Sequence, residues 1–135
     1  YTLVPRRAVL CVAPTADALL AQLALVLAAG SRAIWLRRGN AEALRSTLPD
    51  AIRSRVDLGA EDAACDAILV EGGAEEIARV AQAFAERSGP VIGMQSRIPE
   101  AAGRVAFVVE HLLVERSLSI NTAAAGGNAS LMSVG

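Results

Sequence analysis

The feature that most constrains the fold is an alternation between short continuous apolar runs and segments of helical periodicity. The runs lie at residues 8–12, 31–36, 56–58, 67–70 and 90–94. Runs that stay apolar on successive residues are typical of strands buried on both faces. Because strands and helices alternate at short spacing, each connection is expected to be a right-handed crossover between parallel strands. The sequence predicts an α/β fold: a Rossmann-like three-layer domain with a five-stranded parallel sheet, ordered 3-2-1-4-5.

Local signals mark where the first two helices begin and end. Thr15 is a candidate N-cap for the helix that follows the first run, and Gly30 is its candidate C-terminal stop. Asn40 is expected to cap a short second helix that Pro49 ends. Between residues 50 and 66 the pattern fits both a short strand and one helical turn, so both alternatives stay open.

The third helix is expected after Gly72 and Gly73. Four apolar side chains recur on one of its faces: Ile77, Val80, Ala81 and Phe84. On the other face Glu75 and Arg79 are four residues apart, in the orientation that favours an ion pair.

Composition narrows the class of protein. The chain has 135 residues and a mass of 13.9 kDa, enough for one domain with one core, and hydrophobic residues make up 53% of it. Its formal net charge is −1, which gives no overall basis for nucleic-acid binding. All basic residues are arginines, so a P-loop and Schiff-base chemistry are excluded because both need a lysine.

The remaining general features concern membranes, thiols and the chain start. The longest apolar stretch, residues 18–29, is too short to span a bilayer, so no stable membrane insertion is expected. Cys11 and Cys65 have no disulfide or metal-ligand spacing and are expected to be reduced. The start lacks a Met and a signal-peptide layout, which we interpret as a cut inside a longer chain.

A Rossmann-like sheet invites a dinucleotide at its first strand-to-helix turn. That turn, residues 11–17, contains no glycine, although glycines normally let backbone N–H groups approach the pyrophosphate. Arg37 and Arg38 follow the second strand and would suit a 2′-phosphate, but without a phosphate loop we interpret them as surface residues. Nucleotide binding is therefore not expected.

Other candidate site residues each have an ordinary structural explanation. Gly72 and Gly73 precede a helix and could hold an anion, but we favour a tight turn that needs positive φ. Glu71 ends the preceding strand with no partner acid or base in view. His111, the only histidine, lies among apolar residues, and Cys11 lies inside a strand. No catalytic residue, cofactor site or metal site is predicted.

The last third of the chain departs from the alternating pattern. We expect a Rossmann-like domain at 1–104, a β-flap at 105–121 and an extended tail at 122–135. Residues 105–109 and 114–121 are interpreted as two strands of a hairpin that leaves the sheet. The exposed edge of such a flap favours pairing, so a homodimer through 105–121 is expected. The tail has no period and is too apolar for a linker, which indicates docking on another domain.

Residues 115–135 read ERSLSINTAAAGGNASLMSVG and resemble the C-terminal end of the proline utilization A family. Residues 68–72 and 89–92 are more loosely similar, so the resemblance covers essentially the whole chain. It implies bacterial bifunctional flavoenzymes in which an FAD-dependent proline dehydrogenase yields pyrroline-5-carboxylate. After hydrolysis, an NAD-dependent aldehyde dehydrogenase oxidises glutamate semialdehyde to glutamate. Those catalytic and cofactor residues lie in other parts of the family's chain, so none is assigned here.

For this segment the resemblance implies a non-catalytic, degenerate aldehyde-dehydrogenase-like domain in a cytoplasmic enzyme. Its partners would be the catalytic domains of the same polypeptide, and its tail would help close the tunnel that carries the intermediate. The residues expected at that contact are Asn121, Thr122, Ala123, Ala124, Ala125, Gly126, Gly127, Asn128, Ser130, Leu131 and Met132. The alternative is a small nucleotide- or anion-binding Rossmann-like domain that uses Gly72, Gly73 and Arg37.

Overall fold

The structure is a computed structural model, and it describes residues 2–99 and 106–117. The strands are β1 Thr2–Pro5, β2 Ala8–Val12, β3 Arg32–Leu36, β4 Val56–Gly59, β5 Ala67–Glu71, β6 Gly93–Arg97 and β7 Leu113–Arg116. The helices are α1 Ala16–Ala29, α2 Ala41–Thr47, α3 Asp50–Arg53 and α4 Ala74–Ala85, with a 3-10 helix η1 at Val109–Leu112.

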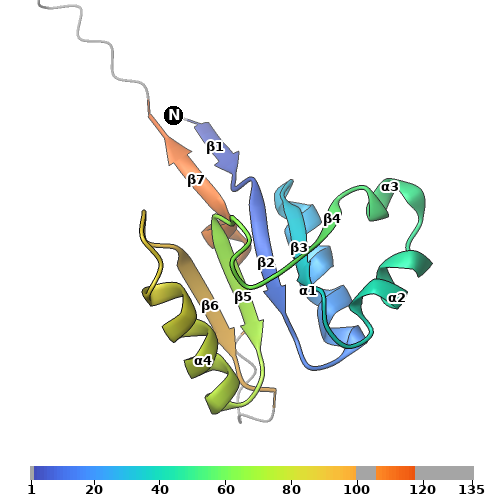
Figure 1. Cartoon of the computed structure of the whole chain (residues 1–135). Coiled ribbons are helices and arrows are strands. Elements are labelled where there is room, and N and C mark those ends of the chain that lie inside the picture. Colours follow the sequence, from blue (N-terminus) through green and yellow to red (C-terminus); the bar gives the residue numbers. More distant parts are fainter. Residues whose placement is uncertain (1, 100–105, 118–135) are drawn as a thin grey trace, which may run out of the picture.

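Five parallel strands form the main sheet in the order β4-β3-β2-β5-β6. Counted from β2 this is the order 3-2-1-4-5, so the predicted α/β fold with a five-stranded parallel sheet is confirmed. Figure 1 shows α1 and α4 on opposite faces of this sheet, with α2 and α3 beyond the β4 edge. The carboxyl ends of β2 and β5 lie side by side where the strand order reverses.

The core explains why the strand runs do not alternate. Val9 and Cys11 of β2 belong to a buried cluster with Leu23 of α1. Leu10 of the same strand belongs to the second cluster, on the face that α4 covers. Because each middle strand is covered on both faces, its successive central positions are apolar, and the charged residues Arg32 of β3 and Glu71 of β5 stand at strand ends.

The ends of α1 are set by the two residues expected there. The Thr15 hydroxyl accepts a hydrogen bond from the Ala18 N–H at 3.2 Å. Gly30 ends the helix with φ 86, and its N–H donates to the Leu27 carbonyl at 3.0 Å. Asn40 precedes α2, although its side chain makes no capping bond. Between residues 50 and 66 the structure contains both a helical turn, α3, and a strand, β4.

The last strand of the sheet differs from its predicted position. The apolar run predicts a strand at 90–94, whereas β6 begins at Gly93 and includes the polar residues Gln95, Ser96 and Arg97. Its extent is fixed by pairing with β5, from Ala67↔Gly93 to Glu71↔Arg97. In the described part β6 is the outer strand, where polar side chains are tolerated.

The predicted hairpin is also wrong where the structure describes it. The first strand, predicted at 105–109, does not form in the described residues: 106–108 belong to no strand and Val109 begins η1, which ends at the fully buried Leu112. β7 overlaps the second strand predicted at 114–121, but it pairs antiparallel with β1, a strand that no apolar run predicted, in the register Val4↔Val114. Figure 1 shows this ribbon extending from the end of the sheet where β2 begins. Residues 105 and 118–121 lie outside the described residues.

Candidate functional site

A crevice with a volume of about 550 Å³ opens at the carboxyl edge of the sheet. The loop after β2 (residues 13–16) and the loop from β3 into α2 (residues 38–41) line it, together with Leu19, Leu44 and Glu76. In doubly wound folds, ligands bind at the carboxyl ends of the strands where the strand order reverses. This crevice is therefore the place where a nucleotide would be expected.

The loop after β2 does not fit the pyrophosphate of a dinucleotide. None of residues 13–16 is a glycine, and Pro14 has no N–H to donate. Thr15 uses its hydroxyl to cap α1, so the Ala18 N–H is already satisfied. Because backbone N–H groups at a helix start are the usual pyrophosphate donors, this loop lacks what an NAD site requires.

An ion pair lies at the mouth of the crevice. The Arg38 guanidinium donates to Oε1 of Glu76, on the first turn of α4, at 2.5 Å. Arg79 donates to both oxygens of the same carboxylate, at 2.9 and 3.1 Å, and also bonds Glu61. The hydrogen bonds from Arg79 and then Arg38 lower the pKa of Glu76 to about 2. The crevice is thus bounded by a carboxylate that stays charged.

These contacts correct one prediction. Arg79 was expected to pair with Glu75, four residues before it, but it bonds Glu76 and Glu61 instead. Arg79 pairs with Glu76 and Glu61 because Arg38 and Glu61 lie on loops that approach α4 in the fold. The local pattern within the helix does not show these loops. Arg37, the other arginine expected after β3, is exposed and lies 3.8 Å from Glu42.

Gly72 and Gly73 do not have the conformation expected of them. Positive φ occurs at Gly30, Gly39 and Gly89, and the predicted positive-φ turn at 72–73 is wrong. Gly72 is buried and a Cβ there would lie 3.3 Å from the Glu76 side chain, so close packing explains this glycine. The first turn of α4 carries Glu75 and Glu76, whose charges oppose an anion at that helix start.

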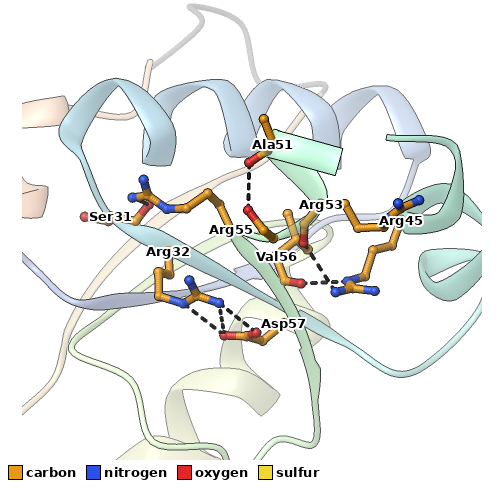
Figure 2. Close-up of polar contacts among 9 residues, drawn as sticks. Ser31, Arg32, Arg45, Ala51, Arg53, Arg55, Val56 and Asp57 are labelled. Carbon is orange, nitrogen blue, oxygen red and sulfur yellow. Dashed lines mark hydrogen bonds and ion pairs between the residues drawn. The ribbon is translucent and has the colours of Figure 1, made fainter. Parts of the chain in front are cut away.

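Other arginines hold main-chain carbonyls rather than a ligand. Figure 2 shows this around β4: Arg45 donates to the Val56 carbonyl at 2.6 Å and to the Arg53 carbonyl at 3.3 Å. In the same view Arg55 lies beside Ser31, whose carbonyl and that of Gly30 accept from its guanidinium. These cations are engaged in joining segments of the fold.

The candidate reactive groups are not brought together. Cys11 is buried, and burial raises the pKa of its thiol to about 12. Glu71 ends β5 at 9% exposure with Arg97 Nε 3.9 Å away, and His111 is exposed on η1. Among residues 2–99 and 106–117 no three or more His, Cys, Asp or Glu side chains are grouped to hold a metal ion. These groups have no shared catalytic geometry.

A larger cavity of about 910 Å³, which no sequence pattern indicated, lies at the amino edge of the sheet beside Cys65. Arg6 donates to the carbonyls of His111 and Asp66, and the Asp66 carboxylate accepts from the main-chain N–H of Arg7 at 2.8 Å. Burial raises the pKa of the Cys65 thiol, although nearby Arg87 opposes this shift. Asp66 and Arg7 precede neighbouring strands, so the predicted strand order was the signal that could have found this contact.

The tail contact falls outside the described residues. Every residue assigned to it, from Asn121 to Met132, lies there. In the described part of the chain no helix is long and apolar enough to cross a membrane.

No model of a known protein family matches the chain. The chain is 40% identical to the bifunctional protein PutA of Salmonella typhimurium and 40% identical to that of Escherichia coli, over 139 residues and 100% of its length. It is 39% identical to the PutA protein of Rhizobium meliloti, again over 100% of its length. It spans only 10%, 10% and 11% of these three relatives.

The crystal structure of a variant of Bradyrhizobium japonicum proline utilization A superposes with a TM-score of 0.55 at 18% identity. The superposition covers 72% of this chain and 12% of that one, and it supports the α/β fold.

Proposed function

This chain matches a segment of the bifunctional PutA proteins over its whole length, and from this premise we propose that it is a non-catalytic C-terminal module of such an enzyme. The complete protein would oxidise proline with FAD and then glutamate semialdehyde with NAD, in the cytoplasm. The module would support the aldehyde dehydrogenase domain of the same polypeptide. The single observation that carries the absence of catalysis is the crevice, whose loop and carboxylate do not suit NAD.

The tail at 122–135 is proposed to help close the tunnel through which the intermediate passes. Its alanines and glycines allow close backbone approach to another surface, and Leu131 and Met132 supply an apolar anchor. Burying each such side chain contributes about 1.5–3 kcal/mol. Ordering about a dozen residues costs about 1–2 kcal/mol each, so backbone hydrogen bonds to a partner domain must supply the difference.

The test is to delete residues 122–135 from the complete PutA polypeptide. Aldehyde dehydrogenase turnover is expected to fall about tenfold, because reacting groups would be less well positioned. A tenfold loss corresponds to a rise of about 1.4 kcal/mol in the activation free energy. Release of the intermediate into solution should rise while proline dehydrogenase activity stays unchanged. A Ser133→Ala variant, which keeps Leu131 and Met132, is the control. Equal losses in both activities, or in neither, contradict the proposal.

The homodimer predicted through 105–121 is the second proposal for this module, and we place it on the ribbon of β1 and β7, because β7 is the strand that residues 106–117 form. Leu3 is 54% exposed and Val114 is 43% exposed on the ribbon. A two-stranded ribbon is marginal by itself, and its strand edges favour further pairing. Light scattering at high protein concentration should give twice the monomer mass, and Val114→Asp should reduce it. A strict monomer before substitution contradicts this proposal.

A further inference from the structure

We propose that Glu76 is the specificity-determining residue of the crevice, an internal counter-ion that holds Arg38 and thereby excludes ligands bearing phosphate groups. The proposal goes beyond the proposed function, which requires only that the crevice binds no cofactor. It assigns the exclusion of anions to one side chain on α4.

The contacts of Glu76 are those that a bound phosphate would make. Two guanidinium groups, from Arg38 and Arg79, donate to its two carboxylate oxygens. Planar arginine donors recognise carboxylate and phosphate with the same geometry. The carboxylate therefore fills the position where an anion would meet Arg38.

The charge balance gives the same result. Arg38, Glu76, Arg79 and Glu61 form a continuous chain of ion pairs with two positive and two negative groups. Arg38 and Glu76 both line the crevice. Neutralising Glu76 leaves this chain with an excess positive charge at the crevice wall. An anion entering the unaltered crevice must instead displace a carboxylate held by two cations.

The loop after β2 already lacks what a dinucleotide requires, so dinucleotide binding cannot report on the ion pair. Inorganic pyrophosphate is smaller than a dinucleotide and needs no glycine loop if an arginine is free to bind it. Pyrophosphate is thus the probe that separates the effect of the ion pair from that of the loop.

The experiment compares four forms of the chain by calorimetric titration with inorganic pyrophosphate at fixed ionic strength. Glu76→Gln is expected to bind at least about tenfold more tightly than the unaltered chain, a ratio equivalent to about 1.4 kcal/mol. Glu75→Gln removes the same charge one residue earlier but releases no arginine, so its gain in affinity is expected to be much smaller than that of Glu76→Gln. Adding Arg38→Gln to Glu76→Gln should abolish the gain. Glu76→Ala carries the same expectation as Glu76→Gln and replaces it if the amide variant does not fold.

Equal affinities of Glu76→Gln and Glu75→Gln for pyrophosphate would overturn this inference and leave the proposed function intact. A gain that survives the loss of Arg38 would also overturn it, since another group would then be the anion's partner. Saturable NAD binding by the unaltered chain would instead overturn the proposed function. The two failures are therefore distinguishable.

Discussion

Arginine side chains connect parts of this chain that are distant in sequence. Arg6, Arg45 and Arg87 each donate to two main-chain carbonyls. A guanidinium offers several donors in one rigid plane, whereas a lysine ammonium is a single point on a flexible stem. Because one guanidinium can reach two carbonyls at once, each of these arginines can join two segments, in a sequence that has no lysine.

Replacing Arg45 by lysine tests this explanation. Arg45 uses two different nitrogens to reach the carbonyls of Val56 and Arg53, and a single ammonium keeps only one of these bonds. Because a hydrogen bond from a charged group contributes about 1.5–3 kcal/mol and some solvent replaces it, Arg45→Lys should lower the free energy of unfolding by about 1 kcal/mol. Urea denaturation measures it. Arg37→Lys, at an exposed ion pair, is the control and should change stability by less than about 0.5 kcal/mol. Equal effects of the two variants would contradict the explanation.

Helix boundaries in this chain depend on a few local conformations. Gly30 takes φ 86 immediately after α1, and its N–H satisfies a carbonyl at the helix end. Gly73 also adjoins a helix, yet its φ of −68 and ψ of 166 are ordinary for any residue. The two glycines therefore have different reasons for being present, although both are helix-boundary residues.

Alanine substitution separates these two roles. A Cβ at Gly30 meets Pro5 at no less than 3.5 Å, so the cost of Gly30→Ala is conformational and should be about 1–2 kcal/mol. Gly73→Ala places its Cβ in open space and should change stability by less than about 0.5 kcal/mol, because the entropy lost by the unfolded chain is offset by the weaker preference of alanine for the N-cap of α4. Thermal unfolding of both variants measures the difference. Destabilisation of the Gly73 variant by as much as the Gly30 variant would show that this assignment is wrong.

At the scale of the whole molecule, a chain of ion pairs links the loops after β3 and β4 to the helix that follows β5. Its members, in order, are Arg38, Glu76, Arg79 and Glu61. Arg38 follows β3, Glu76 and Arg79 lie on α4, and Glu61 follows β4. The link thus connects segments on both sides of the crevice. It contributes to stability only while the carboxylates are charged.

Acid should weaken this link in a defined range of pH. The pKa of Glu76 falls from the ordinary 4.5 to about 2 because Arg79 and Arg38 bond its charged form. Its stabilisation is therefore complete above pH 4.5 and is lost as the pH falls towards 2. Since the side chain is 30% exposed, solvent screening limits the contribution to about 1 kcal/mol.

Urea denaturation between pH 2.5 and 6 measures this effect. The difference in unfolding free energy between the unaltered chain and Glu76→Gln should shrink as the pH falls. A Glu75→Gln variant should show a smaller change, because no ion pair of Glu75 is found among the described residues. A difference for Glu76→Gln that stays constant across this range would contradict the prediction.

The sequence by itself determined the kind and order of the elements in the main sheet. Strands buried on both faces need apolar residues at successive positions, and Thr15 and Gly30 act through bonds to residues a few positions away. Such signals are local, so they can be read along the chain. The absence of glycine from the turn at residues 11–17 could be read from the sequence for the same reason.

The tertiary structure decided what depends on residues far apart in sequence. β1 finds its partner β7 more than a hundred residues away, and β6 takes its register from β5 rather than from its own apolar run. Glu76 meets Arg38 because a helix and a loop from different strands converge at one edge of the sheet. The free energy of each such pair depends on two residues or strands that are distant in sequence, so the local sequence of either one alone cannot predict the contact.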